Sequence, residues 1–187
     1  GLESLSGIPG SCGGAVVGNA GAYGRSISDT IVKIYIFDGK SPRWISKSDA
    51  EFSYRRSIFK EKSWIVLQTV FECIPGDRKV LMKTRKDIIS ARMKKYAPGL
   101  LCPGSFFKNI LVKEVEQEIL EKIDSSKTIG GKIPSGYLLE EAGAYGKREG
   151  GIEGATFHGN LLFNTGEGTY ADVCKLSDEL KKLVWEK

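Results

Sequence analysis

A glycine-rich run near the start constrains the fold more than any other part of this sequence. Residues 7–24 read GIPGSCGGAVVGNAGAYG, and four of the first eight residues are glycine, with a proline among them. Glycine adopts backbone conformations that other residues avoid, and proline favours turns, so one long helix or strand is not expected here. We expect a turn at Pro9-Gly10 that leads into a short helix over residues 12–19, with Ser11 as its N-cap.

The same run is suited to binding an anion. Backbone N–H groups of a glycine-rich loop can point into one concavity, and a following helix N-terminus adds partial positive charge, so a pyrophosphate could rest there. The spacing matches neither the G-x-x-x-x-G-K-[ST] of a P-loop nor the G-x-G-x-x-G of a Rossmann turn. Tight turns between packed elements explain the glycines equally well, so the residues alone leave both interpretations open.

Composition indicates a globular chain with an excess of positive charge. The 187 residues are 41% hydrophobic and 27% charged, and the net charge is +5. This balance suits an anionic partner such as a nucleic acid, a nucleotide or a dinucleotide cofactor. The densest basic run, residues 83–95, has an apolar spine and is predicted to be the solvated face of a helix, with a track for a polyanion as the alternative.

Cysteine spacing and apolar runs point away from several other classes. The four cysteines lie far apart without a C-x-x-C pair, so neither a metal site nor a disulfide framework is predicted. No apolar run approaches the roughly 20 residues that span a bilayer, and no signal-like segment opens the chain. We expect a cytoplasmic, monomeric protein with no membrane partner.

The remaining pattern predicts an α+β chain in two lobes joined near residue 97. Residues 30–38 and 43–45 are expected to form a hairpin, and residues 63–74 and 157–164 are expected to be strands. Helices are expected over residues 77–96, near 113–123, over 136–143, and after a capping box at residues 169–172. In the last helix, the residues expected to face the core are Val173, Leu176, Leu180 and Leu183.

Four segments, in one order along the chain, carry a resemblance to a known family. They are residues 7–24, FSYRRSIFK (52–60), GSFFKN (104–109) and the stretch from IPSGYLLEEAG to GEGTYADV (133–173). Together they resemble UDP-N-acetylenolpyruvoylglucosamine reductase, the MurB family, over nearly the whole chain. The short distance from Tyr54 to Ser105 resembles the family branch that lacks an extra loop over the substrate.

The resemblance implies a flavoenzyme that takes hydride from NADPH onto FAD and passes it to an enolpyruvyl ether carried on a UDP-sugar, giving UDP-N-acetylmuramate. Residues 1–97 would be part of an FAD-binding domain of the PCMH/VAO-like class, and residues 98–187 the smaller α+β substrate-binding domain. The implied cofactor contacts are Gly7, Ile8, Pro9, Gly10, Ser11, Gly13, Gly14, Asn19, Ala20 and Gly21.

Ser105 is the first catalytic residue that the resemblance implies. From the residues alone, a serine after Pro103-Gly104 is a turn or N-cap hydroxyl. Hydride addition to one carbon of an enolpyruvyl group leaves negative charge at its neighbour, and a hydroxyl held close to that carbon can supply the proton that quenches it. The resemblance assigns this proton to Ser105, with Phe106 and Phe107 walling the site or packing beneath it.

Arg55 is the second implied catalytic residue. Its planar guanidinium suits a bidentate grip on the enolpyruvyl carboxylate, and the resemblance places Tyr54 beside it. The next residue, Arg56, is expected to be a surface charge. Arg55 and Ser105 are expected to converge on one pocket facing the loop of residues 8–14.

The other substrate contacts that the resemblance implies are Lys95, Asn109, His158 and Asn160. A lone histidine is more often packed or at the surface than catalytic, so His158 is expected to contact the substrate diphosphate or sugar. For Lys95, the solvated face of a helix is the alternative explanation. Glu140 and Glu141 look like an acidic pair within a helix, and no role is assigned to them.

The chain also departs from the family pattern. Nothing in it matches the N-terminal lobe that sandwiches the flavin, or the glutamate that follows the last helix, so the chain looks truncated and is expected to be inactive alone. Two other classes stay open. A non-catalytic module would bind UDP-sugars without flavin and without Ser105. A basic nucleic-acid-binding domain would bind in a salt-sensitive way, but the aromatic residues show no stacking pattern interleaved with basic ones.

Overall fold

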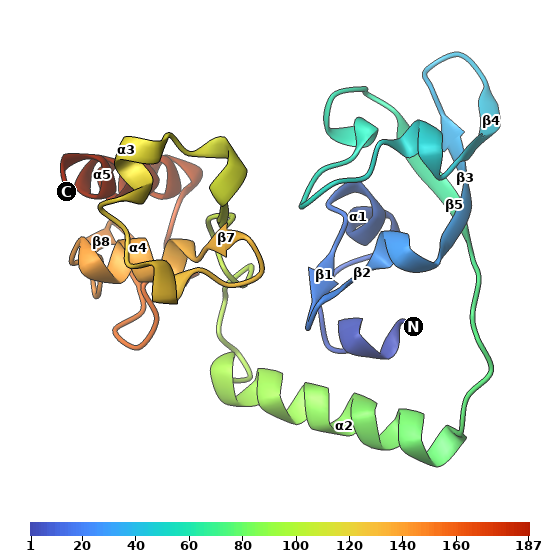
Figure 1. The fold of residues 1–187 in the computed structure, drawn as a ribbon, viewed down its shortest axis with the longest axis horizontal. Helices are drawn as coiled ribbons and strands as arrows, with labels where there is room; N and C mark the ends of the chain where they lie inside the picture. The colour runs from blue at the N-terminus through green and yellow to red at the C-terminus, as the bar shows by residue number, and fades with distance from the viewer. The chain divides into compact units, whose positions relative to one another are not determined.

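The computed structural model describes residues 1–187 and divides into two compact units, Gly1–Lys95 and Tyr96–Lys187 (Figure 1). Each unit has a buried apolar cluster of its own. The mixture of short helices and small antiparallel sheets agrees with the predicted α+β class. No helix is both long enough and apolar enough to cross a bilayer.

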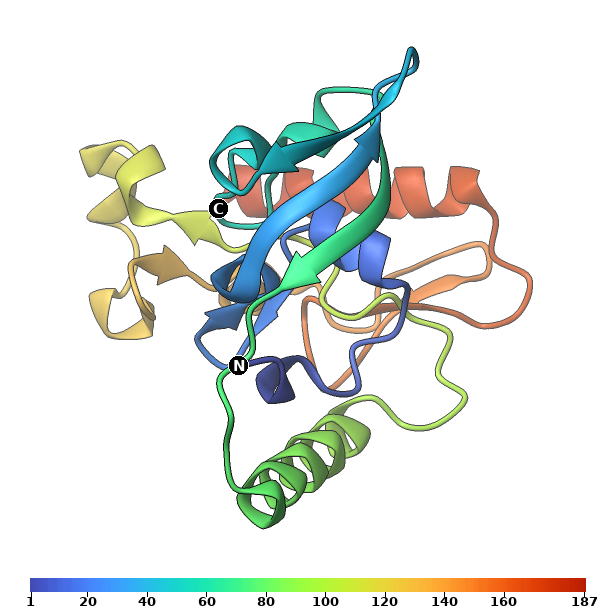
Figure 2. The same cartoon turned by 90° about the vertical axis from the view of Figure 1, so that its right-hand side faces the viewer.

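The first unit is organised around a three-stranded antiparallel sheet in the order β4-β3-β5, whose strands lie side by side in Figure 2. The strands are β3 (Ile31–Phe37), β4 (Pro42–Ser46) and β5 (Ile65–Phe71). In the β3–β4 hairpin, Tyr35 lies opposite Trp44, and their ring centroids are 5.0 Å apart. The predicted hairpin and the predicted third strand are both confirmed.

Helix α1 (Cys12–Val17) packs against β5, as predicted for the residues after Pro9-Gly10. The hydroxyl of Ser11 accepts a hydrogen bond from the Gly14 N–H at 3.1 Å, so Ser11 is the N-cap. The inward side of the helix buries Val16 completely. After α1 the chain forms a small hairpin of β1 (Gly21–Ala22) and β2 (Arg25–Ser26). The 3-10 turns of this unit are Glu3–Leu5, Ile27–Thr30, Ser48–Ala50 and Ile58–Lys60.

Helix α2 (Arg78–Lys95) closes the first unit, and none of its residues is buried. Lys83 and Asp87 form an exposed ion pair one turn apart, at 2.8 Å. Arg92 donates a hydrogen bond to the carbonyl of Gly7 at 3.2 Å. The helix is therefore confirmed, and so is its description as a solvated basic face.

The second unit combines short strands with two helices that carry its core. The strands are β6 (Ile110–Leu111), β7 (Lys132–Ile133), β8 (Arg148–Glu149), β9 (Ile152–Gly154) and β10 (Leu162–Asn164); β6 pairs with β7, and the other three form a sheet in the order β10-β9-β8. The helices are α3 (Gln117–Leu120), α4 (Ser135–Glu141) and α5 (Tyr170–Glu186). Two 3-10 turns, Val112–Glu114 and Ser125–Lys127, complete the unit.

The start of α5 confirms the predicted capping box. The Thr169 hydroxyl accepts from the Asp172 N–H at 3.2 Å, and the Asp172 carboxylate accepts from the Thr169 N–H at 2.9 Å. The hydrogen bond from the Thr169 N–H lowers the pKa of Asp172 below its ordinary value of 3.8. Leu176 and Leu180 of this helix are fully buried, with Val173 and Leu183 against the same cluster, as predicted.

Two predicted elements of the second unit are wrong in extent. The helix expected near residues 113–123 is reduced to the single turn α3, because the preceding residues pair with β7 and the Val112 N–H bonds to the Gly131 carbonyl. The strand expected over residues 157–164 is limited to β10. Its first half is a turn instead, in which the Leu161 N–H bonds to the His158 carbonyl at 3.1 Å.

Candidate functional site

In the first unit, the loop over residues 7–14 borders a cavity of about 440 Å³. This volume lies within the usual range for small-molecule sites, about 300–1,000 Å³. The remaining walls are mostly apolar and come from the first 3-10 turn, from α1 and from the end of β5. Six of the ten residues assigned to the cofactor by resemblance line it, namely Ile8, Pro9, Gly10, Ser11, Gly14 and Ala20.

The backbone of this loop offers hydrogen-bond donors that the chain itself does not use. The N–H groups of residues 10–13 have no acceptor within the protein, whereas the next N–H, of Gly14, bonds to the Ser11 hydroxyl. Gly10 has a φ of +123°, which glycine adopts without strain and which turns the chain toward α1. Consecutive free N–H groups beside an apolar cavity can hold an anionic group joined to a flat apolar one.

Arg55 is tied to the turn that follows α1. Its guanidinium donates to the carbonyl of Asn19 at 3.3 Å and to the carbonyl of Gly21. The Asn19 side chain completes the contact by donating to the Ser53 carbonyl at 2.8 Å. The residue implied to grip a carboxylate therefore lies against Asn19 and Gly21, which were assigned to the cofactor by the same resemblance.

The two neighbours of Arg55 differ in their surroundings. Tyr54 is half-buried, and its ring centroid lies 5.3 Å from the Arg55 guanidinium carbon, close enough for a cation–π contact. Arg56 is exposed and forms an ion pair with Glu61. Arg56 is thus the surface charge that the sequence predicted. Arg55 itself has a φ of +54°, which shows that these residues form a tight turn and not a strand.

In the second unit, Ser105 is exposed on a turn whose backbone is held against the loop 158–161. Gly104 has a φ of +97°, and Ser105 forms an isolated antiparallel bridge with Leu161. Phe106 and Phe107 pack against the core cluster, with ring centroids 4.9 Å apart, so they lie beneath the turn. The turn therefore presents a serine hydroxyl at the surface on a backbone anchored in the core.

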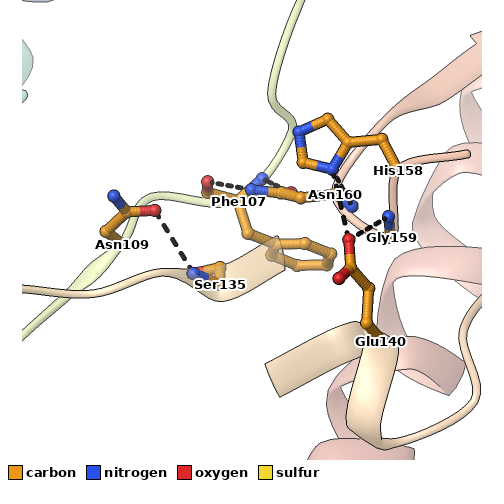
Figure 3. A network of polar contacts seen from close by, with 7 residues as sticks. All are labelled: Phe107, Asn109, Ser135, Glu140, His158, Gly159 and Asn160. Carbon is orange, nitrogen blue, oxygen red and sulfur yellow. Dashed lines mark hydrogen bonds and ion pairs between the residues drawn. The ribbon is translucent and has the colours of Figure 1, made fainter. Parts of the chain in front are cut away.

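Asn160 supplies most of that anchoring, as Figure 3 shows. Its side-chain oxygen accepts from the Phe107 N–H at 2.7 Å, and its side-chain nitrogen donates to the Phe107 carbonyl at 2.9 Å. Its own carbonyl accepts from the Phe106 N–H at 3.0 Å. Asn160 is 2% exposed, so its amide oxygen and one amide N–H are used inside the protein.

Asn109 and the preceding residue meet the start of α4. The Asn109 side-chain oxygen accepts from the Ser135 N–H at 3.2 Å, and the Ser135 hydroxyl donates to the Lys108 carbonyl. Ser135 is buried, and the sequence analysis did not single it out. A proline near a helix start is a common sequence signal, and Pro134 directly precedes α4, but the partners of Ser135 in residues 108–109 could not be identified from that signal.

Glu140 is the functional candidate that the sequence analysis missed. Its carboxylate accepts from the Gly159 N–H at 3.1 Å and lies 3.6 Å from Nδ1 of His158 (Figure 3). Burial raises the pKa of the Tyr145 hydroxyl, and a hydrogen bond to Glu140 raises it further. The sequence showed only a helical acidic residue, and its partners are 18 and 19 residues away.

Lys95, another predicted substrate contact, is exposed in the last turn of α2.

His158 is half-buried beside α4. A Cβ on Gly136 would come within 2.9 Å of His158, so the helix approaches the imidazole as closely as a glycine allows. The Nδ1 atom of His158 also accepts from the Asn160 N–H at 3.4 Å. His158, Asn160 and Glu140 therefore form one polar network beneath the Ser105 turn.

Two aromatic rings of the first unit are each in contact with a cation of the chain itself. The Lys33 ammonium lies 4.5 Å from the ring centroid of Trp44, and the Arg43 guanidinium lies 4.9 Å from that of Trp64. Lys33 and Trp44 lie on the paired strands β3 and β4, whereas Arg43 of β4 meets Trp64, which lies directly before β5. In both pairs a cation of the chain itself covers one face of the ring.

Comparisons with known proteins indicate the family to which the chain is related. The family model for the C-terminal domain of UDP-N-acetylenolpyruvoylglucosamine reductase matches residues 98–187. The chain belongs to the UDP-N-acetylenolpyruvoylglucosamine reductase family. It is 42% identical over its whole length to the reductase of Solibacter usitatus and 33% identical over its whole length to that of Bacillus subtilis.

A solved structure shares the fold. The crystal structure of the reductase MurB from Thermus caldophilus matches 97% of the chain with a TM-score of 0.76 and 25% sequence identity. The chain covers 60% of the Thermus caldophilus protein, 60% of the Solibacter usitatus protein and 56% of the Bacillus subtilis protein. It therefore spans a little over half the length of the relatives that it matches.

Proposed function

We propose that this chain supplies flavin-binding and substrate-binding parts of an oxidoreductase that converts UDP-N-acetylglucosamine enolpyruvate to UDP-N-acetylmuramate. In this proposal NADPH is the reductant, FAD is the cofactor, and the product enters peptidoglycan synthesis. The relatives that match over the whole chain carry the name of this reductase. The observation that carries the proposal is the exposed Ser105 hydroxyl on a turn that the Asn160 amide fixes on both sides of Phe107.

The residues of the first unit fit an FAD diphosphate and its ring. Residues 10–13 present backbone N–H groups without an acceptor in the chain, and the adjoining cavity is mostly apolar. The free N–H groups would bind the diphosphate, and the apolar wall would exclude water from the ring. When bound, the flavin supplies the hydride that the enolpyruvyl double bond takes up.

Two residues of the chain would neutralise the substrate carboxylate and supply the proton. The Arg55 guanidinium, with two of its five N–H donors used on backbone carbonyls, keeps donors for the enolpyruvyl carboxylate. Neutralising that carboxylate makes the double bond a better electron acceptor. The Ser105 hydroxyl would then give its proton to the carbon next to the one that receives hydride, completing the addition of H⁻ and H⁺ across the double bond.

The remaining contacts would bind the UDP-sugar. We propose that Tyr54, His158 and Asn109 contact the substrate. Tyr54 lies beside Arg55, His158 belongs to the network beneath the Ser105 turn, and Asn109 follows that turn and meets the start of α4. Lys95, on the exposed end of α2, is proposed as a weaker contact with the diphosphate. A cytoplasmic monomer that binds neither nucleic acid nor membrane completes the proposal.

Purified full-length protein tests the function directly. We expect the visible absorbance of bound oxidised flavin, and NADPH oxidation that depends on the enolpyruvyl UDP-sugar. Full-length protein without bound flavin and without substrate-dependent NADPH oxidation would overturn the proposal. If calorimetry instead shows UDP-sugar binding that needs no flavin and survives Ser105→Ala, the protein is a non-catalytic binding module.

A further inference from the structure

The Ser105 turn is held by contacts that reach its backbone and not its hydroxyl. Asn160 bonds to the N–H and the carbonyl of Phe107 through its side chain, and to the N–H of Phe106 through its own carbonyl. The three peptide groups that follow the Cα atom of Ser105 are thereby fixed. The direction of the Cα–Cβ bond of Ser105 follows from the backbone on either side of it, so Asn160 determines where the hydroxyl can point.

The loop that carries Asn160 is itself held by α4. The Glu140 carboxylate accepts from the Gly159 N–H at 3.1 Å and faces Nδ1 of His158 at 3.6 Å, and that same nitrogen accepts from the Asn160 N–H at 3.4 Å. A Cβ on Gly159 would come within 2.7 Å of the Glu140 side chain. The loop 158–160 therefore approaches Glu140 more closely than a residue with a Cβ at position 159 would allow.

The first residue of α4 contacts the chain just after the Ser105 turn. This residue, Ser135, bonds to the Lys108 carbonyl through its hydroxyl and to the Asn109 side chain through its N–H. One short helix thus contacts the chain immediately after the Ser105 turn with its first residue, and the loop that clamps that turn with its sixth residue. Both sets of contacts therefore reach the backbone or side chains of residues within four positions of Ser105.

We propose that Asn160 and Glu140 are positioning residues for Ser105: Asn160 fixes the turn directly, and Glu140 fixes the loop that carries Asn160. This inference rests on the proposed role of Ser105 as proton donor. A displacement of about 1 Å at a reacting group can cost about a hundredfold in rate, so loss of the Asn160 contacts should be measurable as a slower reaction. Their loss slows proton delivery to the substrate and leaves the rate of flavin reduction by NADPH unchanged.

The test compares three variants of the full-length protein. Asn160→Asp removes the donor to the Phe107 carbonyl and places a carboxylate oxygen against it. Glu140→Gln keeps an acceptor for the Gly159 N–H and removes the charge facing His158. The matched control is Asn164→Asp, because Asn164 makes the same kind of clamp on another loop, accepting from Gly166 and Gly168 and donating to the Gly168 carbonyl.

Four quantities are measured for each variant: the rate of flavin reduction by NADPH, the rate of flavin reoxidation by the enolpyruvyl UDP-sugar, the melting temperature, and amide hydrogen exchange at Phe106 and Phe107. For Asn160→Asp we expect reoxidation slowed about tenfold to a hundredfold, unchanged reduction, and faster exchange at both amides. Glu140→Gln should slow reoxidation less, in the same direction. Asn164→Asp should lower the melting temperature without changing either rate.

Two results would overturn the proposal. One is equal slowing of reoxidation by Asn160→Asp and Asn164→Asp, which would show a general loss of stability. The other is faster exchange at Phe106 and Phe107 with unchanged reoxidation. If Asn160→Asp does not fold, Glu140→Gln decides the question, since normal reoxidation in that variant is incompatible with a positioning role. A wild-type protein that the sugar does not reoxidise at all would instead overturn the proposed function.

Discussion

The turns that carry Arg55 and Ser105 both hold a polar side chain in position, but they do so through different contacts. Both place a polar side chain on a tight turn with a left-handed backbone torsion, at Arg55 itself in the first unit and at Gly104 in the second. Arg55 is held by its own guanidinium, which bonds to the carbonyls of Asn19 and Gly21. Ser105 is held through the backbone of its neighbours.

The difference follows from what each side chain can reach. A guanidinium has five N–H donors on a long stem, so it can bond to the protein and still offer donors to a ligand. A serine hydroxyl has one proton, which would be lost to catalysis if a carbonyl of the chain held it. We therefore expect substitutions at Arg55 to affect stability and binding together, and substitutions at Ser105 to affect the reaction alone.

The largest effect is expected for Ser105→Ala. General acid catalysis contributes about 10²- to 10⁴-fold, so turnover of the full-length protein should fall by that factor. Flavin reduction by NADPH and the melting temperature should stay at their wild-type values, because the hydroxyl is exposed. Stopped-flow absorbance separates the two half-reactions. A loss of less than about tenfold in turnover would remove Ser105 from the proton-transfer step.

Arg55→Ala should affect both stability and substrate binding. Hydrogen bonds to charged groups contribute about 1.5–3 kcal/mol each, and removal of the guanidinium leaves the Asn19 and Gly21 carbonyls without this donor. We expect a loss of about 1–3 kcal/mol in urea unfolding and a rise of at least about tenfold in KM for the enolpyruvyl sugar.

The neighbouring Arg56→Ala is the matched control for that prediction. Arg56 is exposed and its side chain pairs with Glu61 at the surface, so its removal should leave both stability and KM nearly unchanged. Equal effects of the two substitutions on KM would show that Arg55 has no special relation to the substrate.

Gly104→Ala tests whether the turn itself matters. Nothing lies within 4 Å of a Cβ at this position, so the cost comes from the φ of +97° alone and should be about 1 kcal/mol or somewhat more. Gly39→Ala is the matched control, because Gly39 has a φ of +93° and equally open surroundings in the β3–β4 turn. Both should lower stability to a similar degree, and only Gly104→Ala should slow turnover.

The smallest expected effect is a pH dependence of stability in the first unit. Hydrogen bonds from the Ser41 and Lys40 N–H groups, and then from Arg43, lower the pKa of Asp38 from 3.8 to about 2. A lowered pKa means that the ionised carboxylate stabilises the fold above pH 4, and that this contribution is lost as the pH falls toward 2. Melting temperatures of wild type and Asp38→Asn should therefore converge at low pH.

Asp172→Asn provides the comparison in the second unit, where the Thr169 N–H lowers the pKa of Asp172. It should reduce the acid sensitivity of the unfolding of residues 96–187 and leave that of residues 1–95 unchanged. If neither substitution alters the acid limb of the melting curve, these two carboxylates do not determine it.

Local signals in the sequence predicted much of the fold. The Ser11 cap, the hairpin around Gly39 and the capping box at Thr169 each depend on residues within a few positions of one another, and each is confirmed. The predictions failed where a distant segment competes for the backbone. The helix expected near residues 113–123 is shortened because the chain before it pairs with residues 132–133, and no pattern within residues 113–123 records that partner.

The candidate site shows the same limit. The Ser105 turn and the Arg55 turn were found through the resemblance, since motif segments can be compared one by one. Glu140 was missed because its partners, His158 and Gly159, belong to a different element, and an acidic residue in a helix is ordinarily solvated. Asn160 was found, but its bonds to the Phe107 backbone could be seen only once the two segments lay side by side.

The Asn160 contacts have a consequence for protein engineering. They are made to backbone N–H and carbonyl groups, which every residue except proline possesses, so they need no particular side chain at positions 106 and 107. Libraries that vary these two aromatic residues among apolar alternatives should retain the geometry of the turn. The packing beneath the turn can then be varied while the Ser105 hydroxyl stays in place.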